Sequence, residues 1–66
     1  MSKEGFRALI KLAKQGNDAA QNALGDNFYD GIGVYANRQT AIDWYKKAAA
    51  RNVEKAKEAL TRLGVR

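Results

Sequence analysis

The stretch from Ala20 to Ala49, AQNALGDNFYDGIGVYANRQTAIDWYKKAA, decides the fold of this chain. Apolar and small residues recur in its first half at the spacing that gathers side chains on one face of a helix, and a wider stripe of the same period follows in its second half. Gly31 and Gly33 lie between the halves and allow the backbone conformations that end a helix and reverse the chain. Asn37 is a suitable N-cap for the second helix. The stretch therefore predicts two antiparallel helices joined by a glycine turn.

The sequence also repeats itself at a distance of 36 residues. This shift places Ala20 on Ala56 and Leu24 on Leu60, and most of the other aligned core positions are apolar in both copies. Such a period is typical of helical repeat proteins. We expect the second helix of one unit, a complete unit, and the first helix of a third, with helices near 3–15, 18–30, 38–51 and 54–63. Ser2 is a candidate N-cap for the first of them.

These residues resemble the Sel-one-like repeat (SLR) family, a relative of the tetratricopeptide repeat. The family pattern runs through the stretch without gaps, at Ala20, Leu24, Gly25, Phe28, Gly31, Gly33, Val34, Asn37, Ala41, Trp44, Tyr45, Lys47, Ala48 and Ala49. The flanking half-units match less closely, since Ala8 and Leu9 stand where Trp and Tyr are usual and Thr61 stands where glycine is usual. The resemblance implies an all-α fold, a short right-handed α/α solenoid of about four antiparallel helices that forms one domain over residues 1–66.

The composition argues against an enzyme and against a bound metal or cofactor. The chain has no Cys and no His, and its one serine is Ser2, so the usual nucleophiles and zinc ligands are missing. The segment 31–36 fits the dinucleotide fingerprint G-x-G-x-x-A, but it follows a helical pattern and not a strand. Asp26 and Asp30 lie one turn apart without a third ligand, which indicates solvent-facing acids.

The sequence contains no pattern of a targeting or membrane-spanning segment. Arg7, Lys11 and Lys14 interrupt the apolar pattern of the first helix, whereas a signal peptide needs an uninterrupted apolar run of about 7–15 residues. No run approaches the ~20 apolar residues of a membrane span. We expect a cytoplasmic protein without a membrane partner.

The resemblance also indicates where a partner would bind. In this family the first helix of each unit lines the concave face, so the polar sides of the helices at 18–30 and 54–63 are expected to form a shallow groove. Transferred position by position, its residues are Ala19, Asn22, Asp26, Tyr29, Asp30, Lys55, Glu58 and Arg62. The expected function is a protein–protein interaction module, a small adaptor, inhibitor or assembly factor whose partner is another protein. The polar face of an amphipathic helix is the alternative interpretation of each residue.

Basic residues suggest a second function. The net charge is +5, and the basic side chains gather on the first and third helices, at Lys3, Arg7, Lys11, Lys14, Arg38, Lys46, Lys47 and Arg51. A solvated helix surface is the plainer interpretation, and a nucleic-acid interface on these convex helices is the functional alternative. Self-association through the ends of the solenoid, which would make a homo-oligomer, is a third hypothesis.

Overall fold

The computed structural model describes residues 3–65, except for the side chain of Lys3. Four helices follow one another: α1 (Lys3–Lys14), α2 (Asp18–Asp30), α3 (Arg38–Ala50) and α4 (Glu54–Arg62). Helices α1, α3 and α4 each end one residue earlier than expected, and the candidate cap Ser2 lies outside the described residues. No strand forms within residues 3–65, so the prediction of a small all-α repeat fold is confirmed.

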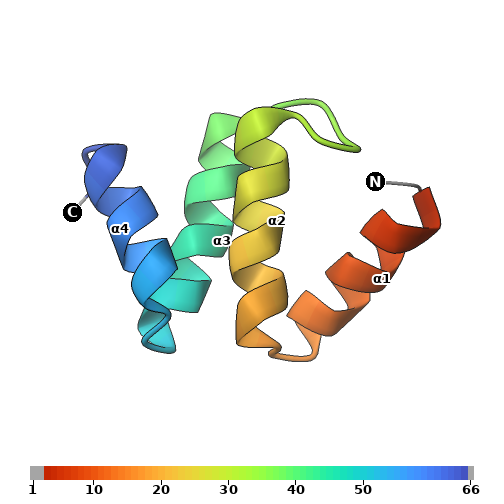
Figure 1. The fold of residues 1–66 in the computed structure, drawn as a ribbon, viewed down its shortest axis with the longest axis horizontal. Helices are drawn as coiled ribbons and strands as arrows, with labels where there is room; N and C mark the ends of the chain where they lie inside the picture. Colours follow the sequence, from red (N-terminus) through yellow and green to blue (C-terminus); the bar gives the residue numbers. More distant parts are fainter. Residues whose placement is uncertain (1–2, 66) are drawn as a thin grey trace.

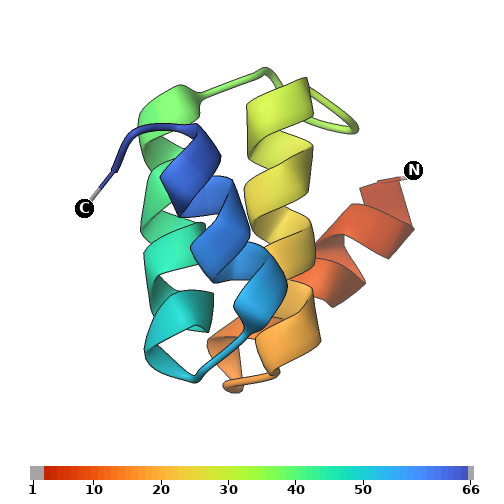
Figure 2. The same ribbon diagram turned by 60° about the vertical axis from the view of Figure 1, so that its left-hand side comes forward.

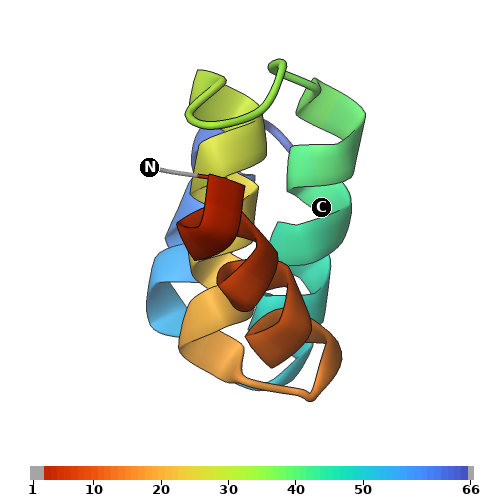
Figure 3. The same cartoon turned by 90° about the vertical axis from the view of Figure 1, so that its right-hand side faces the viewer.

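Each helix packs on the helix that follows it, and consecutive helices run in opposite directions (Figure 1). The α2–α3 pair forms the centre, with α1 on one side and α4 on the other (Figure 1). After rotation, α4 lies in front of the α2–α3 pair (Figure 2). The view from the opposite end shows α1 lying across the same pair (Figure 3). Helix α2 therefore has neighbours on several sides, which is why its side chains include most of the buried polar ones.

Local sequence signals end and begin these helices. The side chains of Asn17 and Asn37 each accept a hydrogen bond from the backbone N–H three residues later, at 2.9 and 3.1 Å. These bonds satisfy N–H groups that have no partner within the helix. Gly31 and Gly33 adopt positive φ angles of 73° and 72°, and Asn52 adopts 65° in the turn between α3 and α4. The turns thus form where residues tolerant of the left-handed conformation stand.

The core consists of two apolar clusters that share Phe28. The first joins α3 to α4 and contains Ala41, Tyr45, Ala48, Ala56 and Ala59, with Leu60 and Leu63 packed against it. The second joins α1 to α2 and contains Ala13, Ala20 and Leu24, covered by Phe6, Leu9, Ile10 and Trp44. The inward faces of α1 and α4 are thus apolar. Because most fully buried side chains are alanines, there is little bulk between the helices.

Two residues of the repeat pattern are less enclosed than a core position. Trp44 is half-buried and covers the second cluster, and the Nζ atom of Lys47 lies 4.6 Å from the centre of its ring. A cation above an aromatic face is an attractive contact that leaves one side of the ring accessible. Val34, in the loop after α2, is also half-buried. Trp44 therefore closes the edge of the core and does not fill its centre.

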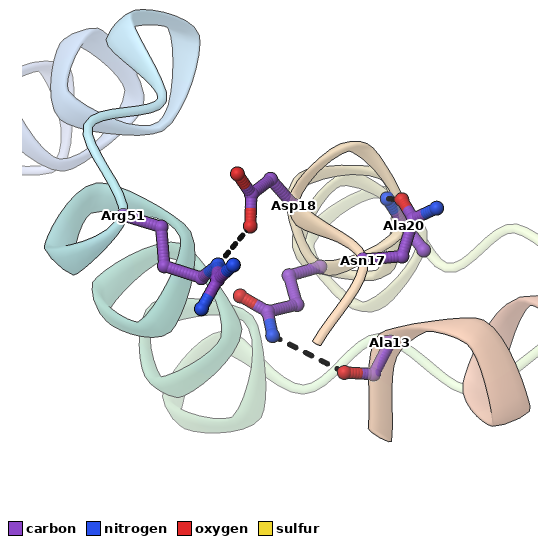
Figure 4. A network of polar contacts seen from close by, with 6 residues as sticks. Ala13, Asn17, Asp18, Ala20 and Arg51 are labelled. Carbon is purple, nitrogen blue, oxygen red and sulfur yellow. Dashed lines mark hydrogen bonds and ion pairs between the residues drawn. The ribbon is translucent and has the colours of Figure 1, made fainter. Parts of the chain in front are cut away.

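Polar side chains at the start of α2 connect this helix to both of its neighbours. Asp18 forms an ion pair with Arg51 at the end of α3 (Figure 4). On the other side, the Nε2 group of Gln21 donates a hydrogen bond to the carbonyl of Ala13 in α1, at 3.1 Å (Figure 4). Gln21 is buried, so this bond satisfies a donor that would otherwise be costly to leave unpaired.

Helices α2 and α3 make close contact at a single glycine. A Cβ atom on Gly25 would lie 2.5 Å from both Cδ1 and Cε1 of Tyr45. The ring belongs to a residue that is only 2% exposed, so it has no free space to move into. A glycine within a helix costs about 1 kcal/mol relative to alanine. Gly25 is therefore explained by packing, because the Tyr45 ring occupies the space where any other side chain would begin.

We predict that Gly25→Ala destabilises the protein although alanine favours a helix. Overpacking a filled core costs about 1–3 kcal/mol, and at this short distance the upper end of that range exceeds the gain of about 1 kcal/mol in helix propensity. The expected net loss is about 2 kcal/mol, measured by urea unfolding followed by circular dichroism.

The matched control is the same change in a Tyr45→Leu background. Without the ring, Gly25→Ala should become neutral or stabilising, and the coupling between the two sites is read from the double-mutant cycle. Equal effects in both backgrounds would contradict the close contact.

Candidate functional site

Two adjoining hollows lie where α2 faces α4, and Arg62 borders both. The polar hollow measures about 280 Å³ and is lined by Asn22, Asp26, Lys55, Glu58 and Arg62. The apolar hollow measures about 150 Å³ and is lined by Tyr29, Tyr45, Ala59, Arg62 and Leu63. We call the two together the α2–α4 groove. The structure brings six of the expected partner-binding residues to it, whereas Ala19 and Asp30 are exposed and line neither hollow.

The polar hollow carries charges that the fold does not use. Within residues 3–65, Lys55, Glu58 and Arg62 form no ion pair or hydrogen bond through their side chains. The Oδ1 atom of Asn22 is buried and likewise has no hydrogen-bond partner in this part of the chain. Two carboxylates and two cations line the hollow, so its net charge is close to zero. These side chains offer hydrogen-bond donors and acceptors to a polar segment of either positive or negative charge.

Asp26 is tied to the core by Tyr45. The Oη atom of Tyr45 donates a hydrogen bond to Oδ1 of Asp26 at 2.5 Å. Burial of the phenol raises the pKa of Tyr45 above its usual value, and the hydrogen bond and negative charge of Asp26 raise it further. Asp26 is exposed, as expected of a solvent-facing acid, and it also accepts this hydrogen bond from the core. Its carboxylate is held in one position at the boundary between the two hollows.

Tyr29 gives the apolar hollow an accessible aromatic wall. Its side chain is 47% exposed, while Ala59 and Leu63 add aliphatic surface from α4. Arg62 stands between this surface and the charged residues of the polar hollow. Tyr and Arg are the residue types most often found at the energetic centre of protein interfaces. The groove can thus hold an apolar side chain next to a polar or charged one.

The Sel1 repeat family model matches residues 18–53, which is more than half of the chain. The chain belongs to the Sel1 repeat family. Sel1 repeats mediate protein–protein interactions and are generally non-catalytic. The match covers α2, the glycine loop and α3, so the α2 wall of the groove lies inside it and α4 lies beyond it. No curated protein and no solved structure matches the chain.

Residues 3–65 contain no group of three or more His, Cys, Asp or Glu side chains placed to hold a metal ion. Among the described helices, none combines the length and the apolar character needed to cross a membrane.

The basic residues of the Sel1 repeat chain divide into two groups. Of the basic residues expected to form a surface on the first and third helices, three make contacts within the fold: Arg51 pairs with Asp18, Arg38 donates to the carbonyl of Leu63 at 3.0 Å, and Lys47 lies over Trp44. The side chains of this expected surface that remain exposed without such a contact, among the described residues, are Arg7, Lys11, Lys14 and Lys46. The expected basic surface is therefore smaller than the sequence suggests, and the side chain of Lys3 lies outside the description.

Sequence reasoning missed two features of the surface. The sequence indicates Tyr45 only as part of the repeat pattern, yet Tyr45 also contributes its hydroxyl and part of its ring to the groove. The signal for this role of Tyr45 is Gly25, because a glycine within a helix indicates that a bulky side chain of another helix packs against it. The second feature is the loop after α2, where Tyr35 is 95% exposed and Ile32 is 45% exposed. A loop has no helical period, so no sequence pattern indicated this exposure.

The Tyr45–Asp26 bond predicts a specific dependence of stability on pH. The folded protein retains the Tyr45 proton above the usual phenol pKa of about 10, at which the unfolded chain releases it. The stabilisation is therefore complete below pH of about 10 and is lost as the pH rises further. Tyr45→Phe should lower stability by about 1 kcal/mol at pH 7, and the difference from the unmodified chain should shrink at alkaline pH.

Urea unfolding of both proteins between neutral and alkaline pH measures this difference. Tyr35→Phe is the matched control, because Tyr35 is exposed and makes no hydrogen bond through its hydroxyl in the described structure. A gap that stays constant with pH for Tyr45→Phe would show that its proton is not held by the fold.

Proposed function

We propose that this chain is a small, non-catalytic protein-binding module that holds a segment of a partner protein in the α2–α4 groove. The observation that carries the proposal is the set of charged side chains Lys55, Glu58 and Arg62, which face the groove without a partner inside the fold. Keeping charged groups ordered at a hollow has no evident benefit for stability, since unpaired surface charges contribute little. A binding role in an adaptor, inhibitor or assembly factor accounts for them.

The two hollows define the chemistry of the partner segment. A hollow of about 150 Å³ walled by Tyr29 and Leu63 has room for a single apolar side chain. The adjoining polar hollow, with balanced charges, suits a polar or charged residue next to that anchor. The charges of the groove, on Asp26 from α2 and on Lys55, Glu58 and Arg62 from α4, would mainly fix the register of the bound segment. They would add less to its affinity. The expected ligand is therefore a short segment with one apolar anchor and polar neighbours.

A nucleic-acid role has weaker support. Arg7, Lys11 and Lys14 are exposed on α1, but no aromatic side chain suited to stacking bases accompanies them on that helix. Other basic side chains make contacts within the fold, as Arg38 and Arg51 do. Binding to nucleic acid is therefore kept as an outcome of the test.

The test uses peptides selected from a random displayed library on the immobilised chain. Tyr29→Ala/Arg62→Ala should weaken their binding about 30-fold or more, because truncating an interface hot spot costs about 2 kcal/mol or more. The affinity should change only modestly with salt, since the groove has almost no net charge. Fluorescence titration of the selected peptides measures both quantities.

Arg7→Ala/Lys11→Ala is the matched control, which removes two exposed side chains far from the groove residues in sequence. It should bind the peptides as the unmodified chain does, and both double variants should show unchanged thermal unfolding. The proposal fails if the α1 variant alone loses binding. Capture of single-stranded RNA with a steep salt dependence, lost in the α1 variant, would assign the function to nucleic acid.

A further inference from the structure

The internal repeat allows the open faces of α1 and α4 to be compared with their buried counterparts. The shift of 36 residues places α1 on α3 and α2 on α4. Within the structure α3 packs on α2, so the residues of that contact have equivalents on α1 and on α4. Those equivalents lie on opposite sides of the α2–α3 pair (Figure 1). They cannot meet each other within one molecule.

On α1, the equivalent positions are apolar and only partly covered. Tyr45 and Ala48 are buried in α3. Of their counterparts, Leu9 is half-buried and Leu12 is 45% exposed. Leu12 is one of the few large apolar side chains with such exposure. It lies next to the stripe of Phe6, Leu9 and Ala13 that packs on α2, so it widens the apolar face of the helix beyond what α2 covers.

On α4, the equivalent positions are also incompletely covered. Leu24 and Gly25 are buried in α2. Of their counterparts, Leu60 is half-buried and Thr61 is exposed. The hydroxyl of Thr61 donates to the carbonyl of Lys57 at 3.0 Å, so its hydrogen-bonding need is met within α4. The outward surface of this face thus combines Leu60 and Thr61 with the partly exposed Lys57, which lies between them on the helix surface.

The two open faces complement each other in size and in polarity. Inside the molecule, the large Tyr45 ring lies against Gly25, which has no side chain. The equivalent pair is Leu9 and Thr61, in which a smaller residue replaces the ring and a larger one replaces the glycine. The ion pair of Arg51 with Asp18 has Gln15 and Glu54 as its equivalents, an amide donor and a carboxylate acceptor.

We propose that α1 of one copy of this chain packs on α4 of a second copy, in the arrangement that α3 has on α2 within one molecule. The partner of this face is thus a second copy, joined head to tail. Because the two faces differ, each joined pair keeps one open α1 face and one open α4 face, and further copies can add. The contact involves a single helix pair, which makes it small and the association weak.

This joint is separate from the α2–α4 groove. Along α4, Lys55, Glu58 and Arg62 point to the groove, whereas Leu60 and Thr61 belong to the joint. At 100° per residue, Leu60 lies on the side of α4 opposite to these three residues, and Thr61 lies between the two sides, next to Glu58. Self-association can therefore fail or succeed independently of peptide binding, and Tyr29→Ala should leave it unchanged.

Sedimentation equilibrium of the 66-residue chain from about 0.01 to 1 mM tests the proposal, because weak interfaces need such concentrations. The average mass should rise continuously with concentration and should not stop at a dimer. Leu12→Glu and Thr61→Glu should each remain monomeric, because each places a charge in one half of the joint. Circular dichroism verifies that both variants fold.

An equimolar mixture of the two variants distinguishes this arrangement from a symmetric dimer. The mixture retains one intact joint, between α4 of the Leu12→Glu chain and α1 of the Thr61→Glu chain. Its mass should therefore rise to that of a pair and no further. A symmetric contact between two α1 faces would instead leave Thr61→Glu dimeric by itself, which would overturn the proposal, as would an unmodified chain that stays monomeric throughout.

A disulfide trap provides a second measurement, since the chain has no cysteine of its own. Mixed Leu9→Cys and Thr61→Cys chains should cross-link at least tenfold faster than Lys46→Cys mixed with Thr61→Cys, because only the first pair lies within disulfide distance. Equal rates would contradict the register of the joint.

Discussion

The contact between Gly25 and Tyr45 is the constraint on which the rest of this structure depends. The absence of a Cβ atom at Gly25 lets the aromatic ring of α3 lie directly against α2, where a side chain would overlap it. The same ring belongs to the cluster of small residues that joins α3 to α4. One glycine therefore determines how closely the central pair packs and also where α4 can lie. In a chain whose buried residues are mainly alanines, a single large ring accounts for much of the contact area in that cluster.

Tyr45 also connects stability to the surface. Its ring is buried in the core, while its hydroxyl reaches the groove and donates to Asp26. Fixing one carboxylate in this way leaves the other charges of the groove, on Lys55, Glu58 and Arg62, without partners in the described structure. One carboxylate of the groove is thus anchored to the core, and the other charged groups are available to a partner. Such an arrangement favours binding, because a side chain that is already held in place loses little conformational entropy when a partner binds.

The candidate groove was predictable to the extent that it follows the helical period. Asn22, Asp26 and Tyr29 share a face of α2 by spacing alone, and Lys55, Glu58 and Arg62 do so on α4. That the two faces meet at two hollows depends on how the helices are placed. Asp30 shares the period but lies at the last residue of α2, beyond the reach of α4. Arg38 and Arg51, which the charge pattern assigned to an open basic surface, have partners on α4 and α2 that only the packing shows.

The sequence by itself determined the helices, their caps, the turns and the repeat. These features depend on interactions within a few residues, such as the N-cap bonds of Asn17 and Asn37 and the positive φ angles of Gly31 and Asn52. Only the tertiary structure decided that Trp44 closes an edge of the core, that Asp26 accepts from Tyr45, and that Arg62 separates an apolar hollow from a polar one. The physical reason is that these contacts join residues of different helices. Their geometry depends on the distance and orientation between helix axes, which side-chain packing sets and no local spacing encodes.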